Sequence, residues 1–374
     1  MPAAAHRSGR SVMSTPDDIN LRSEVPDTVT VEHRGEHEWR VTQRFLGDEH
    51  DNNHNVTWLR IRNPGPETPI RVEVIWAEFR YMADRGFGYL KHGDAWATVR
   101  GETTPTSTVY EFTAPAGDSL FGTFPWYGIE DESRFIETIC ARSTLYSVRS
   151  IGRTGEGRPI NCLCIGDESK PSFVVLARMH AAESAGSWAV EGAAEYLLGD
   201  EARPLLEQYR FHLFISVNPD GVANGIKLTR MGPVEEYDMV RGGMTSADPT
   251  IVALREELFS LQPACLISHH SYLWSVPFLG VFERQVGLDM LDYLVNDDDL
   301  GNTGAWLVRF TGAERGFLRW ECYSRFDTTV AFTELPWHHR LPDTISGQGV
   351  DILKATLAAH QHKLRARRGE MYVR

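Results

Sequence analysis

The chain has 374 residues, of which 42% are hydrophobic and 24% charged, and a formal net charge of −13. This length predicts about two domains, at about 100–200 residues each. The acidic balance argues against nonspecific binding of nucleic acid, whose phosphates require a basic face. No apolar run reaches the roughly 20 residues that a bilayer-spanning helix needs. We therefore expect a globular protein with neither nucleic acid nor membrane as a partner.

The opening segment MPAAAHRSGRSVMSTPDD lacks the apolar centre of a secretory signal, so we expect a flexible tail over residues 1–22 and a cytoplasmic protein. The five cysteines are an odd number and several lie inside apolar runs. This usage is typical of reduced, buried thiols. Cys162 and Cys164 are too close for the usual zinc hairpin and would share one face of a strand, so we interpret them as packing residues.

Residues 23–128 consist of short segments in which apolar and polar residues alternate, among them TVTVEHR, NVTWLRIRN and STVYEFTAP. Turn-rich stretches such as NPGPETP separate these segments. Alternation with period two and many β-branched and aromatic residues predict an antiparallel sheet, which we interpret as a β-sandwich domain.

The pattern changes over residues 129–374. Apolar strands such as SFVVLAR, RFHLFISVN and ACLISHH alternate with helical patterns at 188–198, 249–261 and 287–294. Strands separated by helices predict an α/β sheet with parallel members. The last helical pattern, 345–368, predicts a closing amphipathic helix.

Several predicted strands end in side chains that can carry chemistry, and in an open α/β sheet ligands bind outside the carboxyl ends of the strands. One strand is followed by His180 and Glu183, another ends in His269 and His270, and a third ends in Glu334. Two histidines and a glutamate can hold a borderline-soft cation with one position open for water, which is the pattern of a catalytic zinc site. A further glutamate near that water can act as general base and general acid.

Each of these pieces also has a structural interpretation. The pair His180 and Glu183 could be a surface pair at the start of a helix, His269 and His270 could be a core histidine beside an exposed one, and Glu334 could be the last exposed position of a strand. Their occurrence together, in chain order, favours the metal site.

Five segments in chain order carry a resemblance to a known family: SIGRTGEGRPINCLCIG, ARMHAAESAGSW, VNPDGVANG, LISHHSYLWSVPFLG and TVAFTELPW. They resemble the zinc carboxypeptidases of the carboxypeptidase A type, and the layout is similar to that of the cytosolic carboxypeptidases, which place a β-sandwich before the catalytic domain. The resemblance implies that family's mixed, eight-stranded sheet flanked by helices and one zinc ion per chain.

The resemblance assigns roles residue by residue. His180, Glu183 and His270 would hold the zinc ion, and Glu334 would activate the attacking water. Arg230 stands where the family carries the arginine that stabilises the negative charge of the tetrahedral intermediate.

A second group of roles concerns the substrate. Asp238 would orient His180, and Arg241 would grip the terminal carboxylate of the substrate through its planar guanidinium. Val240 replaces a family asparagine that shares this grip, which weakens the case for a free α-carboxylate. The family's cytosolic group has a basic specificity pocket, so the resemblance implies a preference for acidic terminal residues and directs attention to arginines between 305 and 330. The candidate pocket and substrate residues are Asn224, Tyr272, Arg309, Arg315, Arg319, Tyr323 and Arg325.

The sequence thus predicts a zinc-dependent metallocarboxypeptidase that hydrolyses the C-terminal amide bond of a peptide or an aminoacyl-amide, with an acidic terminal residue as the favoured substrate. Two other interpretations stay open: a zinc-dependent deacylase or amidohydrolase of a small N-acyl compound, which Val240 favours, and a binding protein without catalysis.

Overall fold

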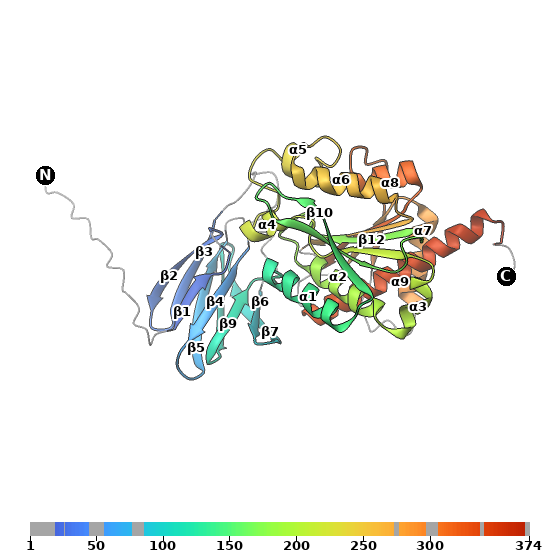
Figure 1. Ribbon diagram of the computed structural model, residues 1–374. Helices are drawn as coiled ribbons and strands as arrows, with labels where there is room; N and C mark the ends of the chain where they lie inside the picture. Colours follow the sequence, from blue (N-terminus) through green and yellow to red (C-terminus); the bar gives the residue numbers. More distant parts are fainter. Residues whose placement is uncertain are drawn as a thin grey trace, which may run out of the picture. The chain divides into compact units, whose positions relative to one another are not determined.

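The computed structural model describes residues 19–25, 27–44, 56–76, 86–272, 277–296, 306–336 and 340–370. The chain divides into two compact units: one holds Thr57–Thr123 and the chain up to Arg44, and the other holds Phe124–Arg374 together with Phe45–Val56. The first unit is built of strands and the second of strands and helices (Figure 1).

The first unit contains one sheet of nine strands within the described residues, in the order β1-β4-β9-β6-β7-β8-β5-β3-β2. The strands are β1 Asn20–Ser23, β2 Val29–Gly35, β3 Glu38–Gln43, β4 Trp58–Asn63, β5 Thr68–Ile75, β6 Phe87–His92, β7 Ala95–Thr103, β8 Ser107–Ala114 and β9 Gly117–Gly122.

Strand β7 joins the two halves of this sheet. Its first part pairs with β6 and its last three residues pair with β8. The change of partner falls at Gly101, where a Cβ atom would overlap Thr108 and Tyr110, so only glycine lets the backbone pass this close. The prediction of a β-rich first domain is confirmed, but the layers are halves of one continuous sheet, and the pair β3–β5 is parallel.

Strand β1 lies partly in the segment that we expected to be a tail. It pairs antiparallel with β4, Leu21 opposite Ile61, and both side chains are buried in the core of the first unit. A single apolar residue among polar neighbours gives too little periodicity to predict a strand.

The second unit contains a mixed sheet in the order β10-β11-β13-β12-β14-β17-β15-β16, which confirms the predicted mixed eight-stranded sheet. Its strands are β10 Tyr146–Arg153, β11 Pro159–Ile165, β12 Ser172–Ala177, β13 Arg210–Phe214, β14 Cys265–Tyr272, β15 Phe278–Val281, β16 Leu307–Phe310 and β17 Thr329–Pro336. Its helices are α1 Ile129–Arg142, α2 Ala185–Leu197, the 3-10 turn Asp200–Ala202, α3 Arg203–Leu206, α4 Pro219–Asn224, α5 Val234–Tyr237, α6 Pro249–Leu261, α7 Arg284–Asn296, α8 Leu318–Phe326 and α9 Pro342–Arg367.

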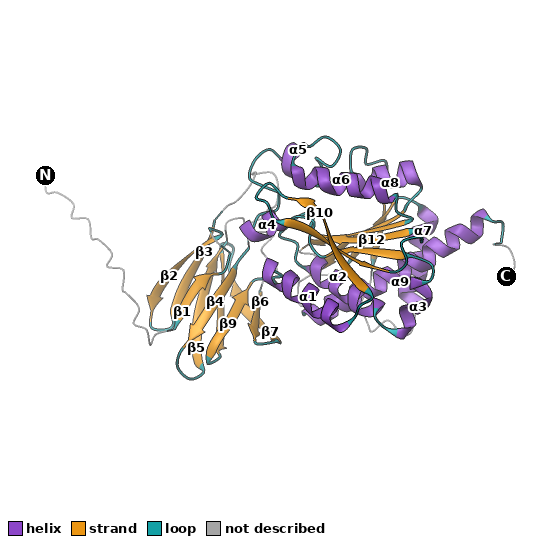
Figure 2. Ribbon diagram, in the orientation of Figure 1, coloured by secondary structure: helices purple, strands orange, loops and turns teal. Residues whose placement is uncertain are grey.

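Helices cover both faces of this sheet (Figure 2). Strand β12 explains why, since Phe173, Val175 and Ala177 point into one apolar core while Val174 and Leu176 point into the other. Helices α1, α2, α7 and α9 contribute to the first core, and α6 and α8 to the second. A strand that is apolar on both faces is typical of the parallel centre of such sheets.

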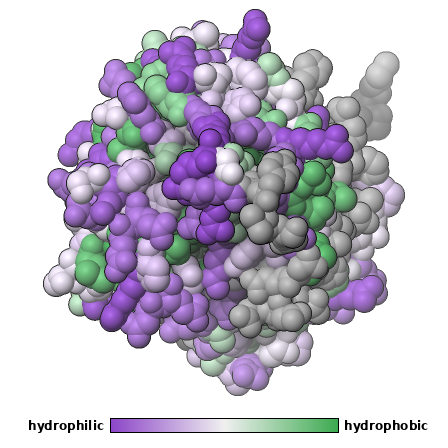
Figure 3. All heavy atoms as spheres, turned by 90° about the vertical axis from the view of Figure 1, so that its right-hand side faces the viewer, coloured by the Kyte–Doolittle hydropathy of each residue, from purple (hydrophilic) through white to green (hydrophobic). Residues whose placement is uncertain are grey.

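The predicted helix at 249–261 matches α6, and its start follows from local sequence. Asp248 is the N-cap residue, its carboxylate accepts a hydrogen bond from the backbone N–H of Thr250 at 2.9 Å, and Pro249 occupies the first helical position. In the part of the chain that is described, no helix combines the length and apolarity that crossing a bilayer requires. Hydrophilic residues predominate on the face shown in Figure 3, with apolar residues in separate small groups.

Candidate metal centre

A tight turn after β12 carries the first two predicted ligands. Arg178 follows the last residue of the strand and lies in the left-handed backbone region with φ 66°, which is uncommon for a residue with a side chain. Its fully buried guanidinium holds the turn, because Nε donates to the carbonyl of Ala181 at 2.6 Å and Nη1 donates to the carbonyl of Tyr127 at 2.9 Å. The turn places His180 and Glu183 over the carboxyl ends of the strands.

The carboxylate of Glu183 lies between the two predicted histidine ligands. His180 Nδ1 is 2.8 Å from Oε1 and His270 Nδ1 is 3.0 Å from Oε2. The two imidazole centroids are 5.0 Å apart, and one potential ligand atom from each of the three residues lies within 4.8 Å of the others. The structure therefore brings His180, Glu183 and His270 together at one point.

This donor set fits a zinc ion, which accepts imidazole nitrogen and carboxylate oxygen. Burial alone would raise the pKa of Glu183, but the two histidines lower it well below its ordinary value. Burial lowers the pKa of His270, whereas for His180 the charges of Glu183 and Asp238 outweigh burial and raise the pKa to about 9. An ionised carboxylate and a neutral imidazole are the forms that bind a metal ion, and a cation would displace the proton of His180.

Outer contacts fix both rings. His180 Nε2 is 3.3 Å from Asp238 Oδ1, and this carboxylate oxygen also accepts the backbone N–H of Val240 at 2.8 Å. His270 Nε2 is 3.2 Å from the hydroxyl of Ser268. Metal-binding histidines commonly use their second nitrogen in this way, which fixes the ring orientation. Asp238 was predicted for this position, and Ser268 was not.

The adjacent residue His269 lies on the opposite face of β14. Its Nδ1 is 2.9 Å from Thr333 Oγ1, and burial lowers its pKa to about 3. Consecutive residues of a strand point to opposite faces, which separates the two histidines, and both are buried.

Glu334 is opposite His270 in the parallel pairing of β14 and β17. Both side chains thus leave the same face of the sheet on neighbouring strands. Glu334 Oε2 is buried and has no hydrogen-bond partner among the described residues. Burial, and next the charge of Glu183, raise the pKa of Glu334 to about 8. A carboxyl group with this position and pKa can take up and release a proton near neutral pH.

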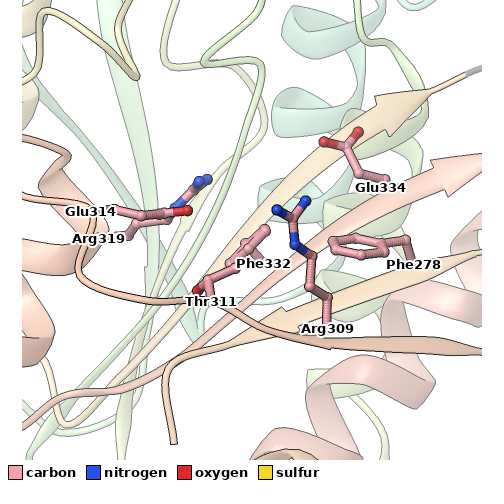
Figure 4. A pocket seen from close by; sticks show the side chains of 7 residues that line it. All are labelled: Phe278, Arg309, Thr311, Glu314, Arg319, Phe332 and Glu334. Atoms are coloured by element: carbon pink, nitrogen blue, oxygen red, sulfur yellow. The ribbon is translucent and has the colours of Figure 1, made fainter.

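A cavity of about 300 Å³ opens beside Glu334 (Figure 4). It receives Phe278 from β15, Phe332 and Glu334 from β17, and two of the predicted arginines, Arg309 and Arg319; Thr311 and Glu314 complete the lining. Gly280 makes room for this wall, because a Cβ atom there would overlap the ring of Phe332.

The two arginines of the cavity differ in their surroundings. Arg319 donates from Nε to Glu314 at 2.7 Å and lies over the Phe332 ring at 4.0 Å from its centroid. Arg309 is exposed, and in Figure 4 its guanidinium lies on the side of the cavity nearer to Glu334. The sequence offered four arginines without distinguishing between them, and two of them line the cavity.

Arg230, the predicted stabilising cation, contacts Tyr237 and is not among the residues that line the cavity. Its guanidinium is exposed, lies 4.2 Å from the ring centroid of Tyr237, and hydrogen-bonds to the Tyr237 hydroxyl. Lys227, which the sequence analysis did not select, is instead buried, with 8% of its surface exposed. Its carbonyl accepts the backbone N–H of Ala181 at 2.9 Å, so its backbone adjoins the ligand turn. Burial is the largest cause of the raised pKa of Glu334, and the positive charge of Lys227 acts in the opposite direction and lowers this pKa.

The remaining candidates lie in other places. Arg241 has an exposed side chain, and Asn224 Nδ2 donates to Glu156 Oε1 at 2.7 Å. Tyr323 packs on Phe282, with ring centroids 5.2 Å apart. Arg325 donates to Glu321 at 2.8 Å, and Arg315 is exposed; neither lines the cavity. The side chain of Tyr272 lies outside the described residues.

Residues 133–239 match the family described as zinc carboxypeptidase, a segment that includes His180, Glu183 and Asp238. An uncharacterized protein of Zymomonas mobilis is 30% identical over 117 residues, which is 30% of each chain. Human cytosolic carboxypeptidase 4 is 41% identical over 58 residues, which is 15% of this chain and 5% of that protein. The chain thus matches less than a third of the length of either relative.

A crystal structure of a metallo-carboxypeptidase from Burkholderia cenocepacia shares the fold, with a TM-score of 0.75, 17% identity, and coverage of 92% of this chain and 100% of that one. The likeness in fold extends over both units, and the family match covers the segment that carries the ligand turn. Residues 133–239 thus match the zinc carboxypeptidase family, and the chain shares its fold with a metallo-carboxypeptidase.

Proposed function

We propose that this protein is a zinc-dependent metallocarboxypeptidase that removes the last residue of a peptide by hydrolysing its C-terminal amide bond. One observation carries the proposal: Nδ1 of His180 and Nδ1 of His270 face the two oxygens of Glu183, with Glu334 on the neighbouring strand. We further propose that this site holds one zinc ion per chain, and that the protein is cytoplasmic because all five cysteines are free thiols.

The chemistry divides between the ion and the chain. A bound zinc ion supplies a Lewis acid and lowers the pKa of water towards about 7. Glu334 accepts a proton from the attacking water and donates it to the leaving amine. Burial raises the pKa of this carboxyl to about 8, which suits a group that takes up a proton and then donates it near neutral pH.

A cation of the chain stabilises the negative charge that develops on the substrate carbonyl. Lys227 supports this role through its burial and its backbone bond to the ligand turn, since a charge in a water-poor site acts more strongly than an exposed one. Arg230, the choice from sequence, is the alternative cation, and its exposed position on Tyr237 would require it to move toward the substrate.

The cavity beside Glu334 supports a terminal residue with an acidic side chain. Arg319 already shares its charge with Glu314, whereas Arg309 makes no ion pair with a described residue. A carboxylate that enters the cavity would therefore pair with Arg309, through a planar guanidinium that suits carboxylates. Phe278 and Phe332 would contact the methylene groups of the same side chain.

Val240 favours a second candidate, a deacylase or amidohydrolase of a small N-acyl compound. Its side chain is buried and offers no hydrogen bond to a substrate, and the neighbouring Arg241 has an exposed side chain. A substrate without a free α-carboxylate would not need the side-chain amide of the asparagine that Val240 replaces.

The test is a hydrolysis assay with the zinc-loaded full chain on blocked peptides that end in Glu or Leu, each with a free or an amidated C-terminus. We expect the free Glu peptide to be cleaved fastest and the amidated peptides at background rate. Equal rates on free and amidated peptides would favour the second candidate. No cleavage of any peptide by zinc-loaded protein would reject the peptidase proposal. His180→Ala serves as the zinc-binding control.

A further inference from the structure

A second cluster of metal-binding side chains lies inside the sheet of the second unit. Cys162 and Cys164 are two residues apart on β11, so they share one face of that strand. In the antiparallel pairing of β11 and β13, His212 is directly opposite Cys164. The register of two strands therefore creates a group of two sulfurs and one imidazole.

The distances within this group match those of a metal site. The two Sγ atoms are 3.5 Å apart, and His212 Nδ1 lies 3.6 Å from Cys164 Sγ and 4.0 Å from Cys162 Sγ. With sulfur at 2.3 Å and nitrogen at 2.0–2.1 Å from an ion, and angles between tetrahedral and trigonal, two sulfurs would be separated by about 3.8–4.0 Å and a sulfur and a nitrogen by about 3.6–3.8 Å. The observed distances lie within about 0.3 Å of these values, so small side-chain adjustments bring all three atoms to one ion.

A disulfide explains the pair less well. Residues two apart on a strand have Cα atoms about 6.6 Å apart, at the upper limit for a disulfide. Both thiols are free, and their side chains run parallel from one face. A bridge would require the strand to bend, whereas a shared ion would not.

The surroundings suit a soft ion. All three side chains are at least 97% buried, in an apolar cluster that also contains Val174 of β12 and Leu254 of α6. Two sulfurs and one imidazole, without an oxygen ligand, select thiophilic ions over magnesium or calcium. The imidazole has no other polar contact among the described residues, because Nε2 is buried without a partner.

The neighbouring charges allow a thiolate to form. Arg149 is opposite Cys162 in the pairing of β10 and β11, and it is held by an ion pair with Glu257. The thiolate is the form of cysteine that binds metals.

We infer that Cys162, Cys164 and His212 form a second metal site, separate from the zinc site at the strand ends, which binds one thiophilic d10 ion, zinc(II) or copper(I). The site lies beneath α6, between strands β11 and β13. An ion there would link these two strands, so we expect it to stabilise the fold. It does not depend on the proposed peptidase activity.

The test uses a signal that only sulfur ligands give. The full chain is titrated with cobalt(II), which replaces zinc and shows a near-ultraviolet charge-transfer band when bound to thiolate. The cluster of His180, Glu183 and His270 contains no sulfur, so it cannot produce this band. We expect one band-forming equivalent in the wild type, its loss in Cys162→Ala and Cys164→Ala, and its retention in Cys265→Ala, which removes a buried thiol from β14 of the same sheet.

A second measurement shows whether the site prefers zinc(II) or copper(I). Under anaerobic conditions the same proteins compete with a colorimetric chelator for copper(I), and we expect Cys164→Ala to bind it at least about tenfold more weakly than Cys265→Ala, since even outer-shell losses cost about that much. A cobalt band identifies a zinc-type site, and copper(I) retention without that band identifies a copper site. The absence of both signals in folded wild-type protein would overturn the inference, whatever the variants do and whether or not the protein cleaves peptides.

Discussion

The two ends of the eight-stranded sheet differ in how far their polar side chains are paired with one another. At the carboxyl ends of β12, β14 and β17, His180, Glu183, His270 and Glu334 converge beside a cavity. Charges of like sign adjoin there, and Glu334 Oε2 has no partner among the described residues. Among the described residues, the charges at this end are therefore not balanced by partners within the protein.

At the amino end of β17 the polar groups are matched. His360 Nδ1 of α9 is 2.8 Å from Thr329 Oγ1, and Lys363 is 3.1 Å from the carboxylate of Asp327 and 2.5 Å from that of Glu283. These contacts attach the last helix to the sheet. The comparison teaches that substitutions at the carboxyl ends should change turnover with little effect on stability, and substitutions at the amino end should do the reverse.

The largest expected effect is that of Glu334→Gln at the carboxyl end. The amide cannot accept a proton from water, so we expect kcat to fall by about 10²–10⁴-fold. Zinc content and thermal midpoint should stay close to those of the wild type, because the three ligands are intact. Turnover within a few-fold of wild type would remove Glu334 from the mechanism.

Substitution of Lys227 and of Arg230 shows which of the two cations stabilises the negative charge on the substrate carbonyl. We expect Lys227→Met, which keeps an unbranched apolar stem, to lower kcat/KM by about 10²–10³-fold, the range for loss of one group that stabilises an oxyanion. The matched change Arg230→Met should have a much smaller effect. The opposite order of effects would return the role to Arg230.

The amino end predicts a pH dependence of stability. Burial, and next the charge of Lys363, lower the pKa of His360 to about 4, from an ordinary value of 6.5. Below pH 6.5, His360 binds a proton in the unfolded chain but not in the folded chain. The free energy of unfolding therefore falls as the pH drops from 6.5 to 4. The loss reaches about 3 kcal/mol at most.

Urea unfolding from pH 7.5 to 4 measures this effect. His360→Asn keeps a polar atom near Thr329 but does not titrate, so its stability should depend less steeply on pH than that of the wild type. Its turnover at pH 7.5 should be close to normal. Parallel pH curves for the two proteins would exclude His360 as the cause.

The smallest expected effect concerns the cavity. Arg309→Gln should reduce kcat/KM for a peptide ending in Glu by about five- to tenfold, a modest value because Arg309 is exposed, and should leave a peptide ending in Leu unaffected. Arg325→Gln is the matched control, since its partner Glu321 lies outside the cavity. An equal reduction of kcat/KM for both peptides would show that Arg309 does not recognise the terminal side chain.

Much of the carboxyl end could be predicted because its residues follow recognisable apolar runs. His180, His270 and Glu334 each come at or just after the end of a buried strand, and parallel strands bring such positions to one edge. The difference between Lys227 and Arg230 could not be predicted. Both are single cations in one short loop, and the burial of Lys227 depends on contacts formed across the fold, among them the bond from the N–H of Ala181 to its carbonyl.

The pocket and the sulfur cluster were harder to predict for related reasons. Strand β16 is four residues long with mostly exposed side chains, so it gives no periodic signal. Arg319 and Arg325 lie on helix α8, which is not among the helices predicted from the sequence. The shared face of Cys162 and Cys164 followed from their spacing. Their partner His212 did not, because the register of β11 and β13 is a property of the whole sheet.

The central claim is that His180, Glu183 and His270 hold one cation. Crystals of the zinc-loaded full chain, measured on both sides of the zinc absorption edge, test it most directly. We expect an anomalous peak about 2.0–2.2 Å from Nδ1 of His180, Nδ1 of His270 and a carboxylate oxygen of Glu183. Zinc-loaded crystals without a peak at this position, or with the two imidazoles directed to different places, would contradict the account.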